Sequence, residues 1–240
     1  MNEKIGALVK TSLVDFPGTV CTAVFLKHCS LRCPYCYNAQ LVTGKDDAGL
    51  STMEEIKAHL LKRRKILDAL TVSGGEPLLN RHTEQIISFA KSLGYKVKLD
   101  TNGTLPALLK KITENPQTRP DFLAMDIKTS PKKYRSLLNA RNLTDRTDYE
   151  TVLKESVEIL KTYPPEKTEF RTVLVPTLIQ EEDIKNIAAL LPENARWEFA
   201  NFLPGNCLEP LYNALPPYTP AETEKLVALA KKFIPGAELR

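Results

Sequence analysis

The stretch TVCTAVFLKHCSLRCPYC, from Thr19 to Cys36, joins a β-branched apolar run to a loop with three closely spaced cysteines. The run over 19–26 is typical of a buried β-strand, and Cys29, Cys33 and Cys36 follow it directly. Three thiolates on one short loop at a strand end suit three corners of an iron-sulfur cluster and leave one iron open. Structural zinc needs four ligands, usually as two separated pairs, and this sequence has no second pair. We therefore expect an iron-sulfur cluster in this loop, and buried thiols without a metal are the remaining alternative.

Outside this stretch, the chain alternates between apolar runs and helical segments. The runs lie at 70–73, 96–99, 121–127, 169–175 and 197–202. Helix starts are predicted by capping boxes at Ser51 with Glu54 and at Thr219 with Glu222. In the last helix, apolar residues recur at helical spacing as Leu226, Leu229 or Ala230, and Phe233. About six strand-helix units favour an α/β fold with a parallel sheet, too few for a closed eight-fold barrel.

Composition limits the class of protein. The 240 residues carry 33 Lys and Arg against 29 Asp and Glu, which gives a formal net charge of +4, and 42% of them are hydrophobic. No apolar run is long enough for a membrane span, and residues 1–10 lack a signal-peptide core. We expect one domain over 1–240, in the cytoplasm, with no membrane and no nucleic-acid partner. The basic run over 62–65 lies in a helical pattern and is read as a solvated helix face.

A second motif, SGGEP over 73–77, follows the next predicted strand. Gly74 and Gly75 allow the backbone to approach a small ligand closely, and Glu76 offers a carboxylate to an ammonium group. Parallel sheets bind ligands at the carboxyl ends of their strands, where this turn and the cysteine loop both lie. The two motifs together predict one cofactor site.

With these motifs the sequence resembles the radical S-adenosylmethionine (SAM) superfamily, and within it the activating proteins of glycyl radical enzymes. The closest resemblance is to activators of anaerobic ribonucleoside-triphosphate reductase. Besides the cysteine loop and SGGEP, it rests on TSLVDFPG at 11–18, KLDTNG at 98–103, AMDIK at 124–128 and FRTVLVP at 170–176. The cysteine loop is specific for the superfamily, and the DFPG, DTNG and MDIK strings narrow the resemblance to activating proteins.

The resemblance implies a partial (β/α)6 barrel in which Cys29, Cys33 and Cys36 hold one four-iron four-sulfur (4Fe-4S) cluster. The open iron takes the amino and carboxylate groups of SAM. The other residues implied to contact SAM are Tyr35 by the adenine, Gly74, Gly75 and Glu76 at the methionine end, and Asp126, Lys128 and Arg171 at the remaining polar atoms. Lys128 and Arg171 are also compatible with a purely structural role in ion pairs.

The implied reaction is reductive cleavage of SAM to a 5′-deoxyadenosyl radical, which removes hydrogen from a glycine of a partner glycyl radical enzyme. The electron comes from a donor such as flavodoxin or ferredoxin, and Asp15 in the DFPG turn lies near the entering peptide. Alternatives are a pyruvate formate-lyase-like partner, a small-molecule substrate as in 7-carboxy-7-deazaguanine synthases, or a non-catalytic electron carrier. A non-catalytic electron carrier would give no function to the SGGEP motif.

Three further expectations concern single positions. Asp100, Thr101 and Asp126 end two neighbouring strands, and two close carboxylates repel unless a proton or a cation lies between them. We therefore expect a monovalent cation there or, alternatively, caps on the following turns. Asn206 stands where some relatives have His beside the adenine, and is a candidate hydrogen-bonding group. Cys207 and Cys21 are expected to be packed or free thiols and not ligands.

Overall fold

The computed structural model describes residues 3–44, 47–138 and 146–240. They fall into two compact units, which we describe separately. The first unit consists of Met1–Ser30, Gln40–Thr101 and Ala107–Leu123; the second consists of Leu31–Ala39, Asn102–Pro106 and Ala124–Arg240. The expectation of one domain over 1–240 stays a prediction.

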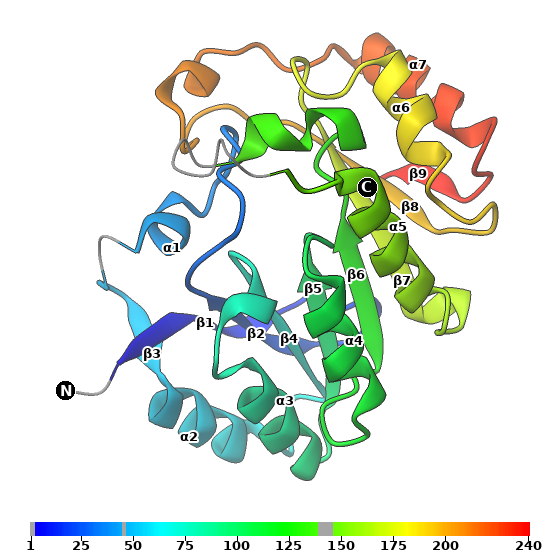
Figure 1. Ribbon diagram of the computed structural model, residues 1–240. Helices are drawn as coiled ribbons and strands as arrows, with labels where there is room; N and C mark the ends of the chain where they lie inside the picture. The colour runs from blue at the N-terminus through cyan, green and yellow to red at the C-terminus, as the bar shows by residue number, and fades with distance from the viewer. Residues whose placement is uncertain (1–2, 45–46, 139–145) are drawn as a thin grey trace. The chain divides into compact units, whose positions relative to one another are not determined.

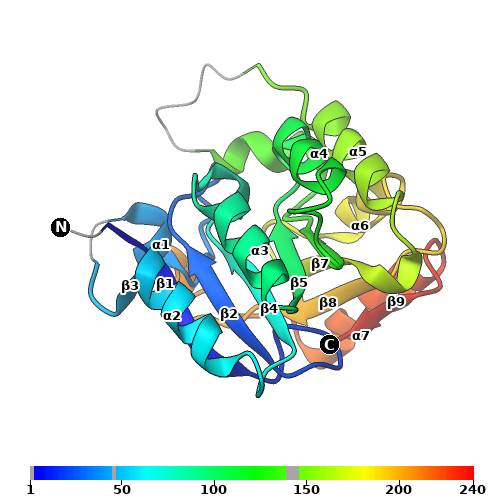
Figure 2. The same cartoon turned by 90° about the horizontal axis from the view of Figure 1, so that it is seen from below.

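Among the described residues, the first unit contains five complete strands, four α-helices and one short 3-10 helix. Its elements are β1 (Lys4–Ser12), β2 (Cys21–Leu26), α1 (Ala39–Thr43), β3 (Leu50–Thr52), α2 (Met53–Arg63), β4 (Ala69–Gly74), η1 (Pro77–Leu79), α3 (Thr83–Ser92), β5 (Lys96–Thr101) and α4 (Pro106–Glu114). The strands are ordered β3-β1-β2-β4-β5. β2, β4 and β5 run parallel, whereas β1 is antiparallel to β2 and β3. Figures 1 and 2 show α2 and α3 side by side against these strands.

Parallel pairing fixes where the chemistry-bearing residues of the first unit lie. In register, Leu26 of β2 pairs with Gly74 of β4, and Val72 of β4 pairs with Leu99 of β5. The cysteine loop, the SGGEP turn and Thr101 therefore all leave the same edge of the sheet, at the carboxyl ends of the strands.

The second unit continues from β6 (Phe122–Asp126), whose first two residues belong to the first unit. Its other elements are η2 (Pro131–Leu137), α5 (Tyr149–Leu160), η4 (Pro165–Lys167), β7 (Thr168–Leu174), α6 (Glu181–Ala188), β8 (Trp197–Asn201), η5 (Pro210–Asn213), α7 (Pro220–Lys231) and β9 (Ala237–Leu239). β7, β8 and β9 are parallel neighbours, and α6 and α7 pack side by side (Figure 1).

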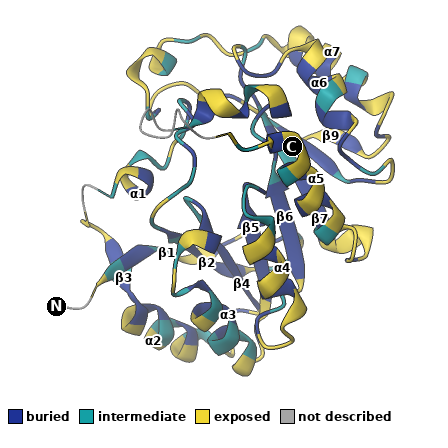
Figure 3. Ribbon diagram, viewed as in Figure 1, coloured by how far each residue is buried: buried dark blue, intermediate teal, exposed yellow. Residues whose placement is uncertain are grey.

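The core of the second unit is built on these strands. Trp197 and Phe199 are fully buried, with ring centroids 4.5 Å apart, and the indole Nε1 of Trp197 donates to Thr172 Oγ1 at 3.0 Å. Figure 3 shows the strands of both units mostly buried, with the exposed residues on the outer faces of the helices. This pattern is the one expected of parallel strands covered by amphipathic helices.

The six predicted strands are confirmed within about two residues at each end, the usual uncertainty of helix and strand bounds. The first capping box was placed one residue too early. Thr52 is the N-cap of α2, and its side chain and that of Glu55 make the two reciprocal bonds. The box at Thr219 and Glu222 is confirmed. Phe233 was wrongly assigned to the buried stripe: it is 44% exposed, whereas Leu226 and Ala230 are buried.

β1, β3 and β9 were not predicted from the sequence. β3 and β9 have three residues each, too few for a period to be seen, and β1 shows no regular alternation of buried and exposed residues. Within the described ranges, every helix is too short or too polar to cross a bilayer.

Candidate functional site

In the first unit, the start of the cysteine loop is bonded to the SGGEP turn. The backbone N–H of Gly75 donates to Leu26 O at 2.9 Å, and that of Glu76 donates to His28 O at 2.7 Å. His28, the residue before Cys29, is anchored in turn by its own N–H to Leu41 O at 3.0 Å. It has a φ of 74°, which is uncommon for a residue with a side chain and is typical of functional turns. The turn therefore fixes the backbone from which Cys29 projects.

This close approach explains both glycines. A Cβ at Gly75 would overlap the carbonyl oxygen of His28 and lie 2.7 Å from its carbon and 3.3 Å from the Cβ of Cys29. A Cβ at Gly74 would overlap the backbone nitrogen of Leu26, and Gly74 also has a φ of 124°, a region that residues with side chains rarely adopt. The prediction that Gly74 and Gly75 permit close backbone contact with a ligand stays a prediction, whereas their contact with the cysteine loop is observed.

Glu76 is fully buried in the first unit. Its Oε1 accepts hydrogen bonds from the backbone N–H of Leu78 at 3.1 Å and from Thr101 Oγ1 at 3.0 Å. The carboxylate thus caps η1 and joins the SGGEP turn to the end of β5. This geometry does not test the predicted bond from Glu76 to an ammonium group. The role of Glu76 in capping η1 and bonding Thr101 was not predicted from the sequence.

The two roles of Glu76 predict different mutant behaviour. Glu76→Gln keeps an acceptor oxygen for Leu78 and Thr101 and removes only the charge, so Tm should stay within a few degrees. If the charge also binds an ammonium, SAM affinity should fall about tenfold or more, because a charge-assisted bond contributes roughly 1.5–3 kcal/mol. Glu76→Ala should lower Tm as well. Calorimetry of SAM binding and thermal unfolding of both variants test this, and unchanged affinity in Glu76→Gln would exclude the ammonium role.

In the second unit, the segment with Cys33 and Cys36 is held by backbone bonds. The N–H of Cys36 donates to Cys33 O at 3.0 Å, which closes a turn. The N–H groups of Leu208 and Glu209 donate to Cys36 O at 3.0 Å and to Pro34 O at 2.9 Å. Cys33 is buried and Cys36 is half-buried. The late loop near Cys207 is therefore used to fix the cysteine turn, a contact that the sequence did not predict.

Tyr35, between these cysteines, is 4% exposed, and its hydroxyl has no hydrogen-bond partner among the described residues. Burial, together with the neighbouring Cys33 thiol, raises the pKa of this hydroxyl well above its ordinary value. Buried hydroxyls usually have a partner, so an orphaned one calls for an explanation. A polar cofactor atom beside Tyr35 would provide it.

Asp126 lies at the end of β6 between two basic side chains of the second unit. Its Oδ1 accepts from Arg171 Nε at 2.6 Å and its Oδ2 from Lys128 Nζ at 3.1 Å. Burial alone would raise the pKa of Asp126, but the charges of Arg171 and Lys128 outweigh it and hold that pKa well below its ordinary value. The carboxylate is thus ionised, and the structural ion-pair role considered for Lys128 and Arg171 is observed here.

This triad lines a pocket of about 240 Å³ in the second unit, together with residues of β7, β8 and the chain after β9. Glu198 and Arg240 are the other charged residues of its lining, and Glu169, nearly fully buried, lies 3.5 Å from Arg171 Nη1. The pocket therefore combines charged groups of both signs, as a zwitterionic ligand requires. The predicted Asn206 is exposed in the loop after β8 and does not line this pocket.

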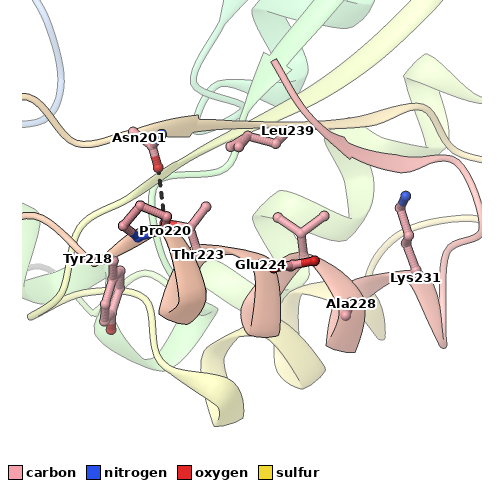
Figure 4. A pocket seen from close by; sticks show the side chains of 9 residues that line it. Asn201, Tyr218, Pro220, Thr223, Glu224, Ala228, Lys231 and Leu239 are labelled. Atoms are coloured by element: carbon pink, nitrogen blue, oxygen red, sulfur yellow. Dashed lines mark hydrogen bonds between the residues drawn. The ribbon is translucent and has the colours of Figure 1, made fainter.

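A second pocket of the same unit, of about 500 Å³, lies along α7. Figure 4 shows Asn201 and Thr223, which are joined by a hydrogen bond of 3.1 Å, with Glu224 and Lys231 on α7 and Leu239 on β9. Its lining contains no cysteine and none of the predicted site residues. We therefore do not assign the cofactor to this pocket.

The carboxylates expected at the cation site both have basic partners. Asp100 Oδ1 accepts from Lys98 Nζ at 2.7 Å in the first unit, and Asp126 has Arg171 and Lys128 in the second. Repulsion between two uncompensated carboxylates was the physical reason to expect a cation. Since each carboxylate is already paired with a cationic side chain, that reason no longer holds, and the cation site stays a prediction.

A family model provides the identification. Residues 24–191, more than half of the chain, match the model described as the radical SAM superfamily. The chain belongs to the radical SAM superfamily. As an enzyme of this superfamily, it uses a 4Fe-4S cluster and SAM. The residues described above fit these groups, because they offer three thiols on one loop, a closely packed glycine turn and an orphaned buried hydroxyl at Tyr35.

Relatives of this radical SAM protein include activating enzymes. It is 29% identical over 243 residues to the "Putative glycyl-radical enzyme activating enzyme" of Methanocaldococcus jannaschii, which covers 100% of this chain and 97% of the relative. It is 28% identical over 214 residues to the pyruvate formate-lyase-activating enzyme of Clostridium pasteurianum, with 85% of this chain covered and 83% of the relative. A 7-carboxy-7-deazaguanine synthase of Hyperthermus butylicus is 40% identical over 96 residues, 38% of each chain.

Solved structures confirm the fold class. TYW1 with a lysine-pyruvate adduct bound has a TM-score of 0.60 at 14% identity, over 89% of this chain and 74% of that one. Native anSMEcpe with bound AdoMet has a TM-score of 0.59 at 16% identity, over 86% of this chain and 58% of that one. The α/β fold of the radical SAM type, with mostly parallel strands, is thereby confirmed.

Two residues of the site region were missed by sequence reasoning. The positive φ of His28 has no sequence signal, because a glycine or asparagine is the usual mark of that conformation. Lys98 lies in the KLDTNG string, but no separate role was predicted for it. Its burial beside Asp100 could have been suspected from its position in an otherwise apolar strand.

Proposed function

We propose that this enzyme installs a glycyl radical on a partner protein, and that the partner is anaerobic ribonucleoside-triphosphate reductase. The observation that carries the proposal is the full-length match to the M. jannaschii protein, together with 85% coverage of the match to a pyruvate formate-lyase-activating enzyme. The choice of the reductase as partner rests on the resemblance of nearly the whole sequence to activators of that reductase.

In this proposal the cysteine loop holds the cluster, and Asp126, Lys128 and Arg171 bind polar atoms of SAM. A cluster held by these cysteines would supply the electron for reductive cleavage of SAM to methionine and a 5′-deoxyadenosyl radical. The backbone of Gly74 and Gly75 positions Cys29, and the buried Tyr35 helps to exclude water. The glycine then gives one hydrogen atom to the 5′ carbon and keeps the unpaired electron, which its flanking amide groups delocalise. Exclusion of water and correct orientation are what the protein adds to such chemistry.

A second candidate is a radical SAM enzyme that acts on a small molecule. It is favoured by the higher identity, 40%, to a 7-carboxy-7-deazaguanine synthase, but that match covers only 38% of this chain. The activating enzymes match most of the chain, and the M. jannaschii match covers all of it, so the protein substrate is the better-supported proposal.

The test of the function is direct transfer of the radical. Reconstituted enzyme, SAM and a reductant are incubated without oxygen with the reductase or with pyruvate formate-lyase. We expect a glycyl doublet in the electron paramagnetic resonance spectrum of the reductase, with one 5′-deoxyadenosine formed per radical. The reductase with its radical glycine changed to alanine is the control. No doublet with either partner, but turnover of the precursor of 7-carboxy-7-deazaguanine, would favour the second candidate.

Asp15 gives a matched variant for the same assay. Its backbone is held independently of its carboxylate, because its N–H donates to Ser12 Oγ at 3.2 Å and its carbonyl accepts from Thr71 Oγ1 at 3.0 Å. Asp15→Ala should therefore keep the turn, and SAM cleavage without a partner should be unchanged. Radical transfer to the partner should fall about tenfold or more, as one charge-assisted contact is lost. Equal loss of both activities would contradict a role for Asp15 in binding the protein substrate.

A further inference from the structure

Lys98 and Asp100 form a buried ion pair inside the first unit. Lys98 is 1% exposed and Asp100 is 7% exposed, and Lys98 Nζ lies 2.7 Å from Asp100 Oδ1. The two residues are two apart on β5, so their side chains project from the same face of the strand. Lysine is almost never fully buried unless it is paired, and burying two charges has a high desolvation cost. A pair in this position therefore needs a reason other than stability.

The location of the pair supplies a reason. Asp100 is followed by Thr101, whose hydroxyl donates to Glu76 Oε1 at 3.0 Å. Glu76 in turn belongs to the SGGEP turn, whose backbone is bonded to the start of the cysteine loop. Lys98 thus neutralises the carboxylate of Asp100. The next residue, Thr101, contacts the SGGEP turn.

The surroundings of Lys98 suit a fixed cation. Its Nζ lies 6.0 Å from the centroid of the Phe122 ring, at the outer limit of a cation–π contact. Phe122 packs with Phe16, Cys21 and Ala69 in a buried apolar cluster of the same unit. An ammonium that lies 2.7 Å from a buried carboxylate, and is tethered by its own side chain, has little freedom to move.

We propose that the Lys98 ammonium is a built-in monovalent cation of this site, which takes the place at Asp100 that a free sodium or potassium ion was expected to fill. Lys98 is a positioning residue in this proposal: it holds the Asp100 carboxylate, and through it the end of β5, in the geometry that SAM binding requires. The proposal rests on the cofactor chemistry of the superfamily and not on the identity of the protein substrate, so it is tested without a partner.

The first test compares salts on the wild-type protein. Thermal unfolding of the cluster-free chain, and SAM cleavage by the reconstituted enzyme with a chemical reductant, are measured in sodium, potassium or choline chloride at equal ionic strength. We expect Tm to agree within about 2 °C and cleavage rates within about twofold in all three salts. A rate or Tm that requires sodium or potassium would overturn the proposal.

The second test removes the tethered charge. Lys98→Met should lower Tm of the cluster-free chain by roughly 10 °C in choline chloride, because the buried Asp100 carboxylate loses the ammonium that lies 2.7 Å from it. Potassium or sodium should restore part of that Tm and of SAM cleavage, since a free ion then has a place. Lys96→Met, at an exposed position of the same strand, is the matched control and should show no salt response.

A purely structural ion pair gives a different pattern. In that case Lys98→Met would lose the same Tm in every salt, and this outcome overturns the proposal. The double variant Lys98→Met with Asp100→Asn removes both charges, so it should recover stability and lose the response to potassium. It also provides a folded protein if the single variant is too unstable to measure.

Discussion

Cys33→Ala is expected to abolish assembly of the cluster and therefore all reductive cleavage of SAM. Wild-type protein reconstituted without oxygen should bind about four irons, because thiolates from three cysteines hold a 4Fe-4S cluster with one iron open. Cys33 is buried in a turn that is closed by the N–H of Cys36 and pinned by Leu208 and Glu209. The described thiols of this turn are those of Cys33 and Cys36, so Cys33→Ala removes one of the three cluster ligands that the sequence predicts.

The control for this prediction is Cys207→Ala. Cys207 is also buried and free, but it lies in the loop after β8, where its N–H donates to Asn213 Oδ1 at 2.8 Å. It should keep the full iron content and the visible absorption of the cluster. Iron and sulfide analysis shows whether each variant assembles the cluster. Stoichiometric zinc in place of iron in the wild-type protein would contradict the assignment of the three cysteines to an iron-sulfur cluster.

The parts of the fold that could be predicted are those that a local pattern determines. The run at 19–26 is apolar because a strand that is covered on both faces contacts other side chains on both. This apolar run allowed β2 to be predicted from the sequence. Thr219 with Glu222 was visible because a capping box is a local hydrogen-bond pattern. At the start of α2 two candidate caps, Ser51 and Thr52, stand side by side, and each has a glutamate three residues later. Only the folded backbone selects Thr52.

The contacts that the sequence did not predict are decided by packing, either between distant segments or within a buried strand. Glu76 was assigned to a ligand because a carboxylate beside two glycines suggests one. Its bond to Thr101 links residues 25 apart, and no local pattern predicts it. The partner of Asp100 was missed for a similar reason: the alternation of a strand places Lys98 on the same face, but only burial makes that neighbour an ion pair. Charged residues in the sequence can indicate a site, but only the packing of the folded chain shows which opposite charges pair with them.

Gly75→Ala is expected to destabilise the first unit and to lower the iron content at the same time. The added methyl would overlap the carbonyl oxygen of His28, which is backbone and cannot rotate away. Relief of this overlap requires breaking the bonds from Gly75 N to Leu26 O and from Glu76 N to His28 O. Overpacking of a rigid site costs about 1–3 kcal/mol or more, so Tm should fall by roughly 10 °C. Cys29 follows His28 directly, so its thiol should be displaced from the cluster.

The control variant is Gly94→Ala, in the turn after α3 of the same unit. Gly94 has a φ of 88° and nothing within 4 Å of the added Cβ, so this change costs only the backbone strain of roughly 1–2 kcal/mol. Gly75 lies outside the left-handed region, so its substitution isolates the steric overlap. We expect Gly94→Ala to lose a few degrees of Tm and no iron, whereas Gly75→Ala loses both. If Gly75→Ala retained the iron content and Tm of the wild type, the glycine turn could not be what positions Cys29, and the link between the two motifs would be wrong.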